Sequence, residues 1–163
     1  MDREGALIDP RRPGRYERIY AQLEGLIAGK SPNLVAAMAT ICAVLHHKMG
    51  HHFWTGFYFL SRDQENELHV GPYQGPVACL VLRDRGVCLH CVRTRAAVDV
   101  PDVEQFPGHI ACDSRSRSEI ALPVMKGDRV IAVLDVDSDK LAQFDEDDVA
   151  PLTRILTLLQ PYL

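Results

Sequence analysis

The sequence lacks a long uninterrupted hydrophobic run. Its longest strongly apolar segment is residues 34–45, whereas a membrane-spanning helix needs about 20 residues and runs of 10–14 are typical of buried helices. The first twenty residues also lack the apolar core of a secretory signal. We therefore expect a cytoplasmic protein that does not insert into a membrane.

Positive charge is scarce as well. Eighteen lysines and arginines face 22 aspartates and glutamates, which gives a net charge of −4. The basic residues within 11–18 and 83–95 are interrupted and offset by acids, so they form no dense cationic block. Nucleic-acid binding depends on such a block, and we expect no nucleic-acid partner.

The chain has only five cysteines. An odd number without a secretion signal argues against a structural disulfide framework. In a reducing compartment, clustered cysteines are more often metal ligands or redox-active thiols, and both alternatives stay open at this point. The cysteines are Cys42, Cys79, Cys88, Cys91 and Cys112.

The length of 163 residues and a hydrophobic content of 47% fit one globular domain. Residues 1–14 are rich in arginine, proline and glycine, and we expect them to be flexible. Residues 15–163 then form the single domain.

Hydrophobic periodicity predicts three longer helices. Residues 15–28 form the first, and residues 31–50 form the second, with Ser31 as N-cap and Pro32 in the first turn. The last helix is capped by Asp145, and Pro151 should kink it or shift its start.

Short β-rich segments and one short helix lie between the longer helices. A hairpin is predicted around residues 126–128, Lys-Gly-Asp, and residues 86–94 can form the short helix. This order predicts an α+β fold with a central antiparallel sheet, helices packed on one face and functional loops on the other. The predicted strands are 53–60, 67–70, 78–82, 97–100, 120–125 and 130–136.

Residues 101–118 form a long polar loop that contains Cys112. Loops of this length inside a compact domain are usually functional. Arg115 and Arg117 can lower the pKa of the Cys112 thiol, whereas Asp113 opposes them. A small cysteine buried under the loop is the alternative, because free cysteine is among the most buried residues.

Cys79 and Cys88 are the candidates to resolve an oxidised Cys112. Cys88 follows Gly86 at a predicted helix N-terminus, a position that lowers a thiol pKa, whereas Cys79 lies in an apolar strand pattern and can equally be core. Cys88, His90 and Cys91 also read as a metal-binding alternative, but no second pair of ligands accompanies them.

Three carboxylates are the candidates for a small acidic pocket. Asp135 and Asp137 alternate and so share one face of a strand, and Glu119 begins the preceding strand near the Cys112 loop. Converging carboxylates bind an ammonium group well. The alternative is that Asp135 and Asp137 line the solvated face of an edge strand.

Trp54 and Tyr58 are four residues apart in a predicted strand and therefore share a face. They can form the wall of a pocket for a small thioether or a cationic group. Aromatic core packing is the alternative interpretation.

With these residues in view, the sequence resembles the free methionine-(R)-sulfoxide reductases, a family with a GAF-type fold. The resemblance covers about residues 31–160. The matching segments are WTGFYFL, GPYQGPVAC, GVC, VPDVEQFPGHIACDSRSRSEIALPV, VLDVDS and FDEDD.

The resemblance implies that Cys112 is the catalytic cysteine, and that Cys79 or Cys88 forms a disulfide with its oxidised form. It implies no cofactor, with thioredoxin or another dithiol as reductant. The acids Glu119, Asp135 and Asp137 match the residues that bind the amino group of free methionine-(R)-sulfoxide and assist protonation of its oxygen. Trp54 and Tyr58 match the aromatic wall of the substrate site.

The same resemblance leaves two further expectations. GAF domains often dimerise through terminal helices, so a homodimer through residues 15–28 is expected by analogy alone. A GAF-type module that binds a small molecule or senses redox state without turnover is the alternative function.

Overall fold

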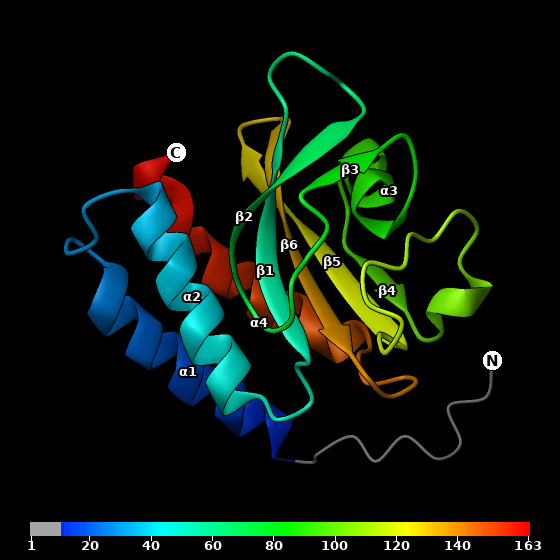
Figure 1. Ribbon diagram of the computed structural model, residues 1–163. Coiled ribbons are helices and arrows are strands. Elements are labelled where there is room, and N and C mark those ends of the chain that lie inside the picture. Colours follow the sequence, from blue (N-terminus) through cyan, green and yellow to red (C-terminus); the bar gives the residue numbers. More distant parts are fainter. Residues whose placement is uncertain (1–10) are drawn as a thin grey trace.

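The computed structural model describes residues 11–163, which form a layered α+β domain (Figure 1). Within these residues six strands form one antiparallel sheet in the order β3-β2-β1-β6-β5-β4. The strands are β1 (Trp54–Leu60), β2 (Glu67–Gln74), β3 (Val81–Arg83), β4 (Val98–Val100), β5 (Ser118–Lys126) and β6 (Arg129–Ser138). The helices are α1 (Arg12–Ile27), α2 (Leu34–Lys48), α3 (Val87–Thr94) and α4 (Glu146–Leu156), with short 3₁₀ turns η1 (Val103–Gln105) and η2 (Thr157–Tyr162).

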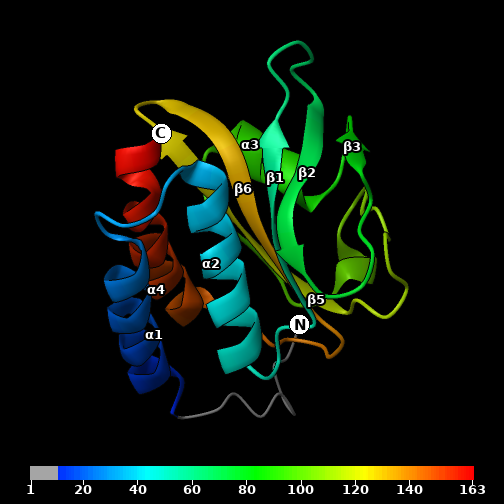
Figure 2. The same cartoon turned by 60° about the vertical axis from the view of Figure 1, so that its left-hand side comes forward.

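Three helices, α1, α2 and α4, cover one face of the sheet, and Figure 2 shows them side by side. Alternate residues of the central strands face these helices, among them Phe57, Leu122, Leu134 and Val136, all fully buried. The period of two along each strand places the intervening residues on the opposite face. The predicted α+β architecture is confirmed, although the short helix α3 lies on the loop-covered face.

The predicted hairpin is confirmed, because β5 and β6 pair from Lys126 and Arg129 back to Ser118 and Ser138. Gly127 has a φ of 61°, a left-handed conformation that glycine adopts without a side-chain clash. The hairpin holds the acidic positions of both strands in a fixed register.

Helix α2 begins later than predicted. Asn33, not Ser31, is its N-cap, and the Asn33 side chain accepts a hydrogen bond from the backbone N–H of Ala36 at 2.8 Å. Ser31 instead donates its hydroxyl hydrogen to the Asn33 carbonyl at 2.9 Å. The amide side chain of asparagine competes well for this position, since it satisfies an otherwise free N–H of the first turn.

Helix α1 begins at Arg12, within the segment expected to be flexible; residues 1–10 lie outside the described residues. Arg12 is buried and donates to the carboxylates of Asp145 and Asp148 at 2.9 Å. Tyr16 donates its hydroxyl hydrogen to Asp148 at 2.7 Å. These tertiary contacts, which a local sequence pattern does not reveal, fix the first turn of α1.

The predicted cap of α4 is confirmed, because the Asp145 side chain accepts from the N–H of Asp147 in a capping box with Asp148. Pro151 lies inside α4 without displacing its start. Residues 11–163 contain no helix of the length and hydrophobicity that a bilayer crossing requires.

Candidate active site

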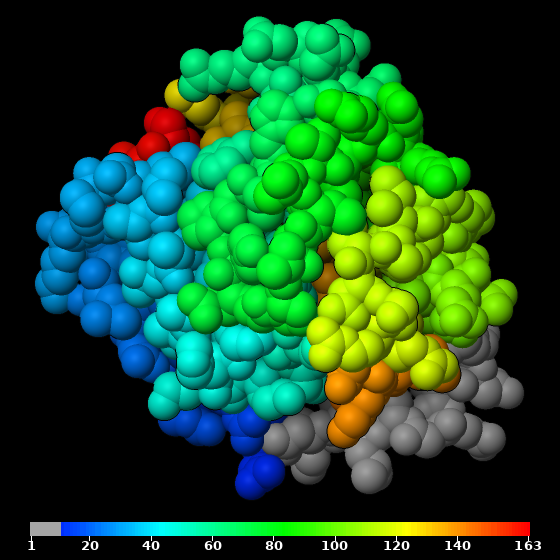
Figure 3. Space-filling view, in the orientation of Figure 1, coloured from blue at the N-terminus to red at the C-terminus, as the bar shows by residue number. Residues whose placement is uncertain are grey.

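A pocket opens on the loop-covered face, above the paired ends of β1, β6 and β5. The first turn of α3 and the loops around Cys79 and Cys112 form its walls, and Figure 3 shows the two loops, green and yellow, meeting on this face. Seven of the eight predicted site residues line the pocket, and the eighth, Cys79, is bonded to one of them. The seven are Trp54, Tyr58, Cys88, Cys112, Glu119, Asp135 and Asp137.

The three acids lie together because the strand register aligns them. Asp137 of β6 pairs with Glu119 of β5 on one side and with Trp54 of β1 on the other. Asp135 lies two residues earlier on the same face of β6. Glu119 is 5% exposed and Asp135 is 6% exposed. Because β6 is a central strand, the alternative of a solvated edge-strand face is wrong.

Burial is the main reason why these acids resist ionisation. It raises the pKa of Glu119 to about 8, with the charge of Asp137 adding to the shift. Burial and the neighbouring Glu119 carboxyl raise the pKa of Asp135 well above its usual value. Burial and Asp135 do the same for the pKa of Asp137, whose Oδ1 accepts a hydrogen bond from Ser116 at 2.9 Å. Raised pKa values favour the protonated form of these carboxyl groups, the form that can donate a proton.

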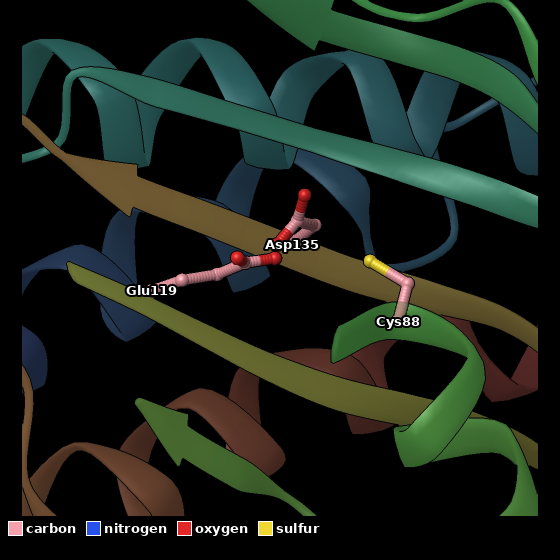
Figure 4. A group of neighbouring side chains, drawn as sticks. All are labelled: Cys88, Glu119 and Asp135. Carbon is pink, nitrogen blue, oxygen red and sulfur yellow. The ribbon is translucent and has the colours of Figure 1, made fainter. Parts of the chain in front are cut away.

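Cys88 lies on the first turn of α3 and points toward two of the acids (Figure 4). Ligand atoms of Cys88, Glu119 and Asp135 all lie within 4.8 Å of one another. The prediction that the helix N-terminus lowers the pKa of Cys88 is wrong. Burial, and then the charges of Asp135 and Glu119, raise that pKa well above its usual value.

Neighbouring residues of α3 do not complete a metal site with Cys88. Cys91 is fully buried among apolar side chains, and His90 is exposed with its ring edge against Phe106. The alternative metal set of Cys88, His90 and Cys91 is therefore wrong, because these side chains diverge around the helix.

Cys79 and Cys112 form a disulfide that links the two loops across the pocket, with their Cα atoms 5.3 Å apart. Cys112 is exposed and Cys79 is half-buried. The predicted strand at 78–82 begins only at Val81, so Cys79 belongs to the loop before β3, where it packs against the apolar cluster of the loop-covered face. The structure thus pairs Cys112 with Cys79, whereas Cys88 is a free thiol.

The aromatic wall also holds the Cys79 loop in place. Trp54 donates its indole N–H to the carbonyl of Pro76, and Tyr58 donates its hydroxyl hydrogen to the carbonyl of Cys79, both at 3.1 Å. The Trp54 ring stacks between Tyr58 and Tyr73, at centroid distances of 5.7 and 5.3 Å. Trp54 and Tyr58 are both buried and both line the pocket. They therefore pack as buried aromatic residues and also form the pocket wall.

Two polar residues that line the pocket, His109 and Ser116, were not among the predicted site residues. His109 places Nε2 at 3.7 Å from Oε2 of Glu119, and burial lowers the pKa of its imidazole. Ser116 holds Asp137 through the hydrogen bond described above. Both stand within four residues of Cys112 in the long loop, and this proximity was the available signal.

Comparison with known proteins agrees with this geometry. Residues 32–160 match the family model described as GAF domain, and the fold and pocket define the chain as a GAF-domain protein. The free methionine-R-sulfoxide reductase of Escherichia coli is 35% identical over 91% of this chain and 88% of its own length. GAF domain-containing protein A of Dictyostelium discoideum is 50% identical over 89% of this chain and 90% of its own length.

A solved structure extends the comparison to three dimensions. The free methionine-R-sulfoxide reductase of Neisseria meningitidis, in complex with its substrate, superposes with a TM-score of 0.85 and is 40% identical, covering 90% of this chain and 87% of that chain. The chain belongs to the free methionine-(R)-sulfoxide reductase family of GAF domains. The resemblance read from the sequence is confirmed.

Proposed function

We propose that this protein reduces free methionine-(R)-sulfoxide to free methionine, with Cys112 as the nucleophile. The observation that carries the proposal is the exposed Cys112, bonded to Cys79 at the mouth of a pocket lined by three acids whose pKa values are raised by burial. Relatives named as free methionine-R-sulfoxide reductases support it, including one described in complex with its substrate.

The chemistry begins with both loop cysteines reduced. The Cys112 thiolate attacks the sulfoxide sulfur while a carboxyl group of the pocket gives a proton to the sulfoxide oxygen. The bond formed between Sγ of Cys112 and the substrate sulfur then breaks as the oxygen passes to Cys112 as a sulfenic acid, and methionine leaves reduced by two electrons. The Cys79 thiol then attacks Sγ of Cys112, water leaves, and the disulfide forms.

Assignment of Cys79 as the resolving cysteine rests on its bond to Cys112 in the structure. Cys88 lies inside the pocket among the acids, so in this scheme it contacts the substrate region instead of the exposed disulfide. A dithiol such as thioredoxin regenerates the enzyme by exchange at this disulfide. The scheme needs no bound cofactor, because the thiols supply both electrons.

Substrate recognition follows from the same residues. Glu119, Asp135 and Asp137 receive the free ammonium group, whose charge stabilises an ionised carboxylate beside it. Trp54 and Tyr58 line the pocket, and in this scheme they face the methyl sulfoxide end of the substrate. A residue within a polypeptide has no free ammonium group, so the acids select a single amino acid. A compartment that keeps dithiols reduced, such as the cytoplasm, suits this cycle.

The homodimer expected from analogy stays a prediction. Helix α1 buries its own apolar stripe against the domain through Tyr16, Ile19, Leu23 and Ile27. A dimer through this helix would therefore use its outer polar face.

A stereospecific assay tests the proposed function. Free methionine-(R)-sulfoxide, the free S epimer and a peptide containing methionine sulfoxide are each supplied with thioredoxin, its reductase and NADPH. We expect turnover of the free R epimer alone. Equal turnover of the peptide would contradict an ammonium-binding pocket, and binding of the R epimer without turnover would favour the sensing alternative.

A further inference from the structure

The side chains of Cys88, Glu119 and Asp135 form a compact group with the chemistry of a metal site. A thiol and two carboxyl groups converge from α3, β5 and β6, with their ligand atoms within 4.8 Å of one another (Figure 4). Each of the three residues is at least nine-tenths buried. Because they stand on regular elements, the group is held in place without a flexible loop.

A second observation points to a ligand at this group. Among the described residues, Oδ1 of Asp135 is a buried oxygen with no hydrogen-bond partner, and Asp135 lines the pocket. Buried polar atoms are nearly always partnered, because an unpartnered one has lost its hydration without gaining a hydrogen bond in exchange. An oxygen left open in a preformed pocket is available to a cation.

We propose that this group binds one zinc-class divalent cation per chain, with Cys88, Glu119 and Asp135 as its protein ligands. Zinc takes thiolate and carboxylate ligands at about 2.0–2.3 Å, so neighbouring ligands of a tetrahedron lie about 3.5 Å apart. The observed separations require side-chain movements of about an ångström. Three protein ligands leave the fourth position for water.

The donor types select the metal. A thiolate among the ligands favours zinc over magnesium and calcium, which prefer oxygen ligands alone. Binding requires the Cys88 thiol and both carboxyl groups to lose their protons, which pass to the buffer. No oxidation or reduction is involved, so the Cys79–Cys112 disulfide stays intact.

The metal and the substrate share two ligands. Zinc on Glu119 and Asp135 occupies the place assigned to the ammonium group of the substrate. It therefore competes with free methionine, the product that carries the same ammonium group. This competition rests on the proposed function, whereas binding of zinc itself does not.

The test uses the full chain in its disulfide form, because Cys79 and Cys112 then offer no thiolate to the metal. Calorimetric titration with Zn²⁺ is expected to give about one site per chain. Titration with Co²⁺ is expected to give thiolate-to-metal charge-transfer absorption. No zinc uptake, or cobalt uptake without that absorption, would overturn the proposal.

Two variants locate the site. Cys88→Ser is expected to weaken zinc binding by about 100-fold and to remove the cobalt–thiolate absorption. The matched control is Cys91→Ser, which alters another buried cysteine of α3 outside the group and should leave both unchanged. Equal zinc binding by Cys88→Ser and the unmodified chain would place the metal elsewhere and overturn the proposal.

A second substitution covers the case in which Cys88→Ser does not fold. Asp135→Asn keeps the size of the side chain, and it should weaken zinc binding in a protein whose circular dichroism is unchanged. Unchanged binding by this variant also overturns the proposal. Free methionine added to the zinc complex separates the two proposals. Displacement of zinc by methionine supports the shared ligands. If methionine does not displace zinc, the zinc site stands but the assigned ammonium site is contradicted.

Discussion

The two faces of the sheet carry opposite kinds of side chain on the same strands. On β6, Leu134 and Val136 face the helices and are fully buried among apolar side chains, whereas Asp135 and Asp137 face the loops and line the pocket. Burial stabilises the first pair and penalises ionisation of the second. The apolar face therefore provides the stability that allows acids with raised pKa values to be held on rigid central strands.

The largest expected effect is on the loop-covered face. Cys112→Ser should lower turnover of free methionine-(R)-sulfoxide by about 10³-fold or more, because the proposed nucleophile is lost. Its melting temperature under reducing conditions should not change. The matched control is Cys42→Ala, which removes a buried cysteine of the helix-covered face and should keep normal activity per folded molecule. Comparable activity in both variants would remove Cys112 from the mechanism.

Substitution of a pocket acid should affect both catalysis and stability, so it separates the two less completely than Cys112→Ser does. Glu119→Gln keeps the shape but removes a proton donor, so kcat should fall by about 10²-fold or more. In the unmodified protein kcat/KM, which reports ionisation of the substrate-free enzyme, should also fall as the pH rises through about 8, the pKa of Glu119. Steady-state kinetics between pH 6 and 9 measures both. A pH profile of Glu119→Gln identical to that of the unmodified protein would exclude this carboxyl as the acid.

A substitution on the helix-covered face should lower stability and leave activity per folded molecule unchanged. Leu152 of α4 is fully buried in the core, and Leu152→Ala should reduce the free energy of unfolding by about 2–5 kcal/mol through the cavity it leaves. Activity per folded molecule should be retained, as kcat/KM at low temperature would show. Leu141→Ala, at a residue 38% exposed, serves as the control with little change. A large loss of kcat/KM in Leu152→Ala would show that the two faces are coupled.

The raised pKa of Glu119 should also make stability depend on pH. The folded chain keeps this proton up to about pH 8, whereas the unfolded carboxyl loses it near its ordinary pKa of 4.5. The unfolding free energy should therefore fall as the pH rises from about 4.5 to 8 and level off above, by about 1–4 kcal/mol from this group. Urea unfolding at several pH values measures the slope, which should be smaller in Glu119→Gln. An equal slope in both proteins would refute the raised pKa.

The smallest effect is expected at Ser116. Ser116→Ala removes the hydrogen bond to Asp137, which is worth about 1 kcal/mol, and should lower kcat/KM by roughly 3- to 10-fold. Ser114→Ala, two residues away in the same exposed loop, is the control and should be unchanged. Equal kinetics for the two variants would show that Asp137 needs no support from the loop.

Much of the fold could be predicted because local signals determine it. The glycine turn fixes the β5–β6 hairpin, and its register brings Glu119 opposite Asp137. Asp145 caps α4 through contacts within three residues. The start of α1 could not be predicted, because it depends on ion pairs between Arg12 and residues more than 130 positions away.

The sequence predicted which residues form the site better than it predicted their pKa values. Family motifs and alternation indicated the acids and the aromatic wall, but the pKa of Cys88 is raised first by burial and then by the carboxyl groups that β5 and β6 bring near it. Burial and these neighbours together outweigh the helix N-terminus, and no sequence spacing reveals either. The pairing of Cys79 with Cys112 also depends on loop positions, since Cys88 stands closer to Cys112 in the chain.

A single-turnover experiment tests the central claim most directly. Fully reduced protein is mixed with excess free methionine-(R)-sulfoxide without any reductant, and methionine and disulfides are then quantified by mass spectrometry. We predict about one methionine per chain, with a new bond between Cys79 and Cys112 and a free thiol at Cys88. Methionine formed while Cys112 stays a thiol, or no methionine at all, would contradict the account.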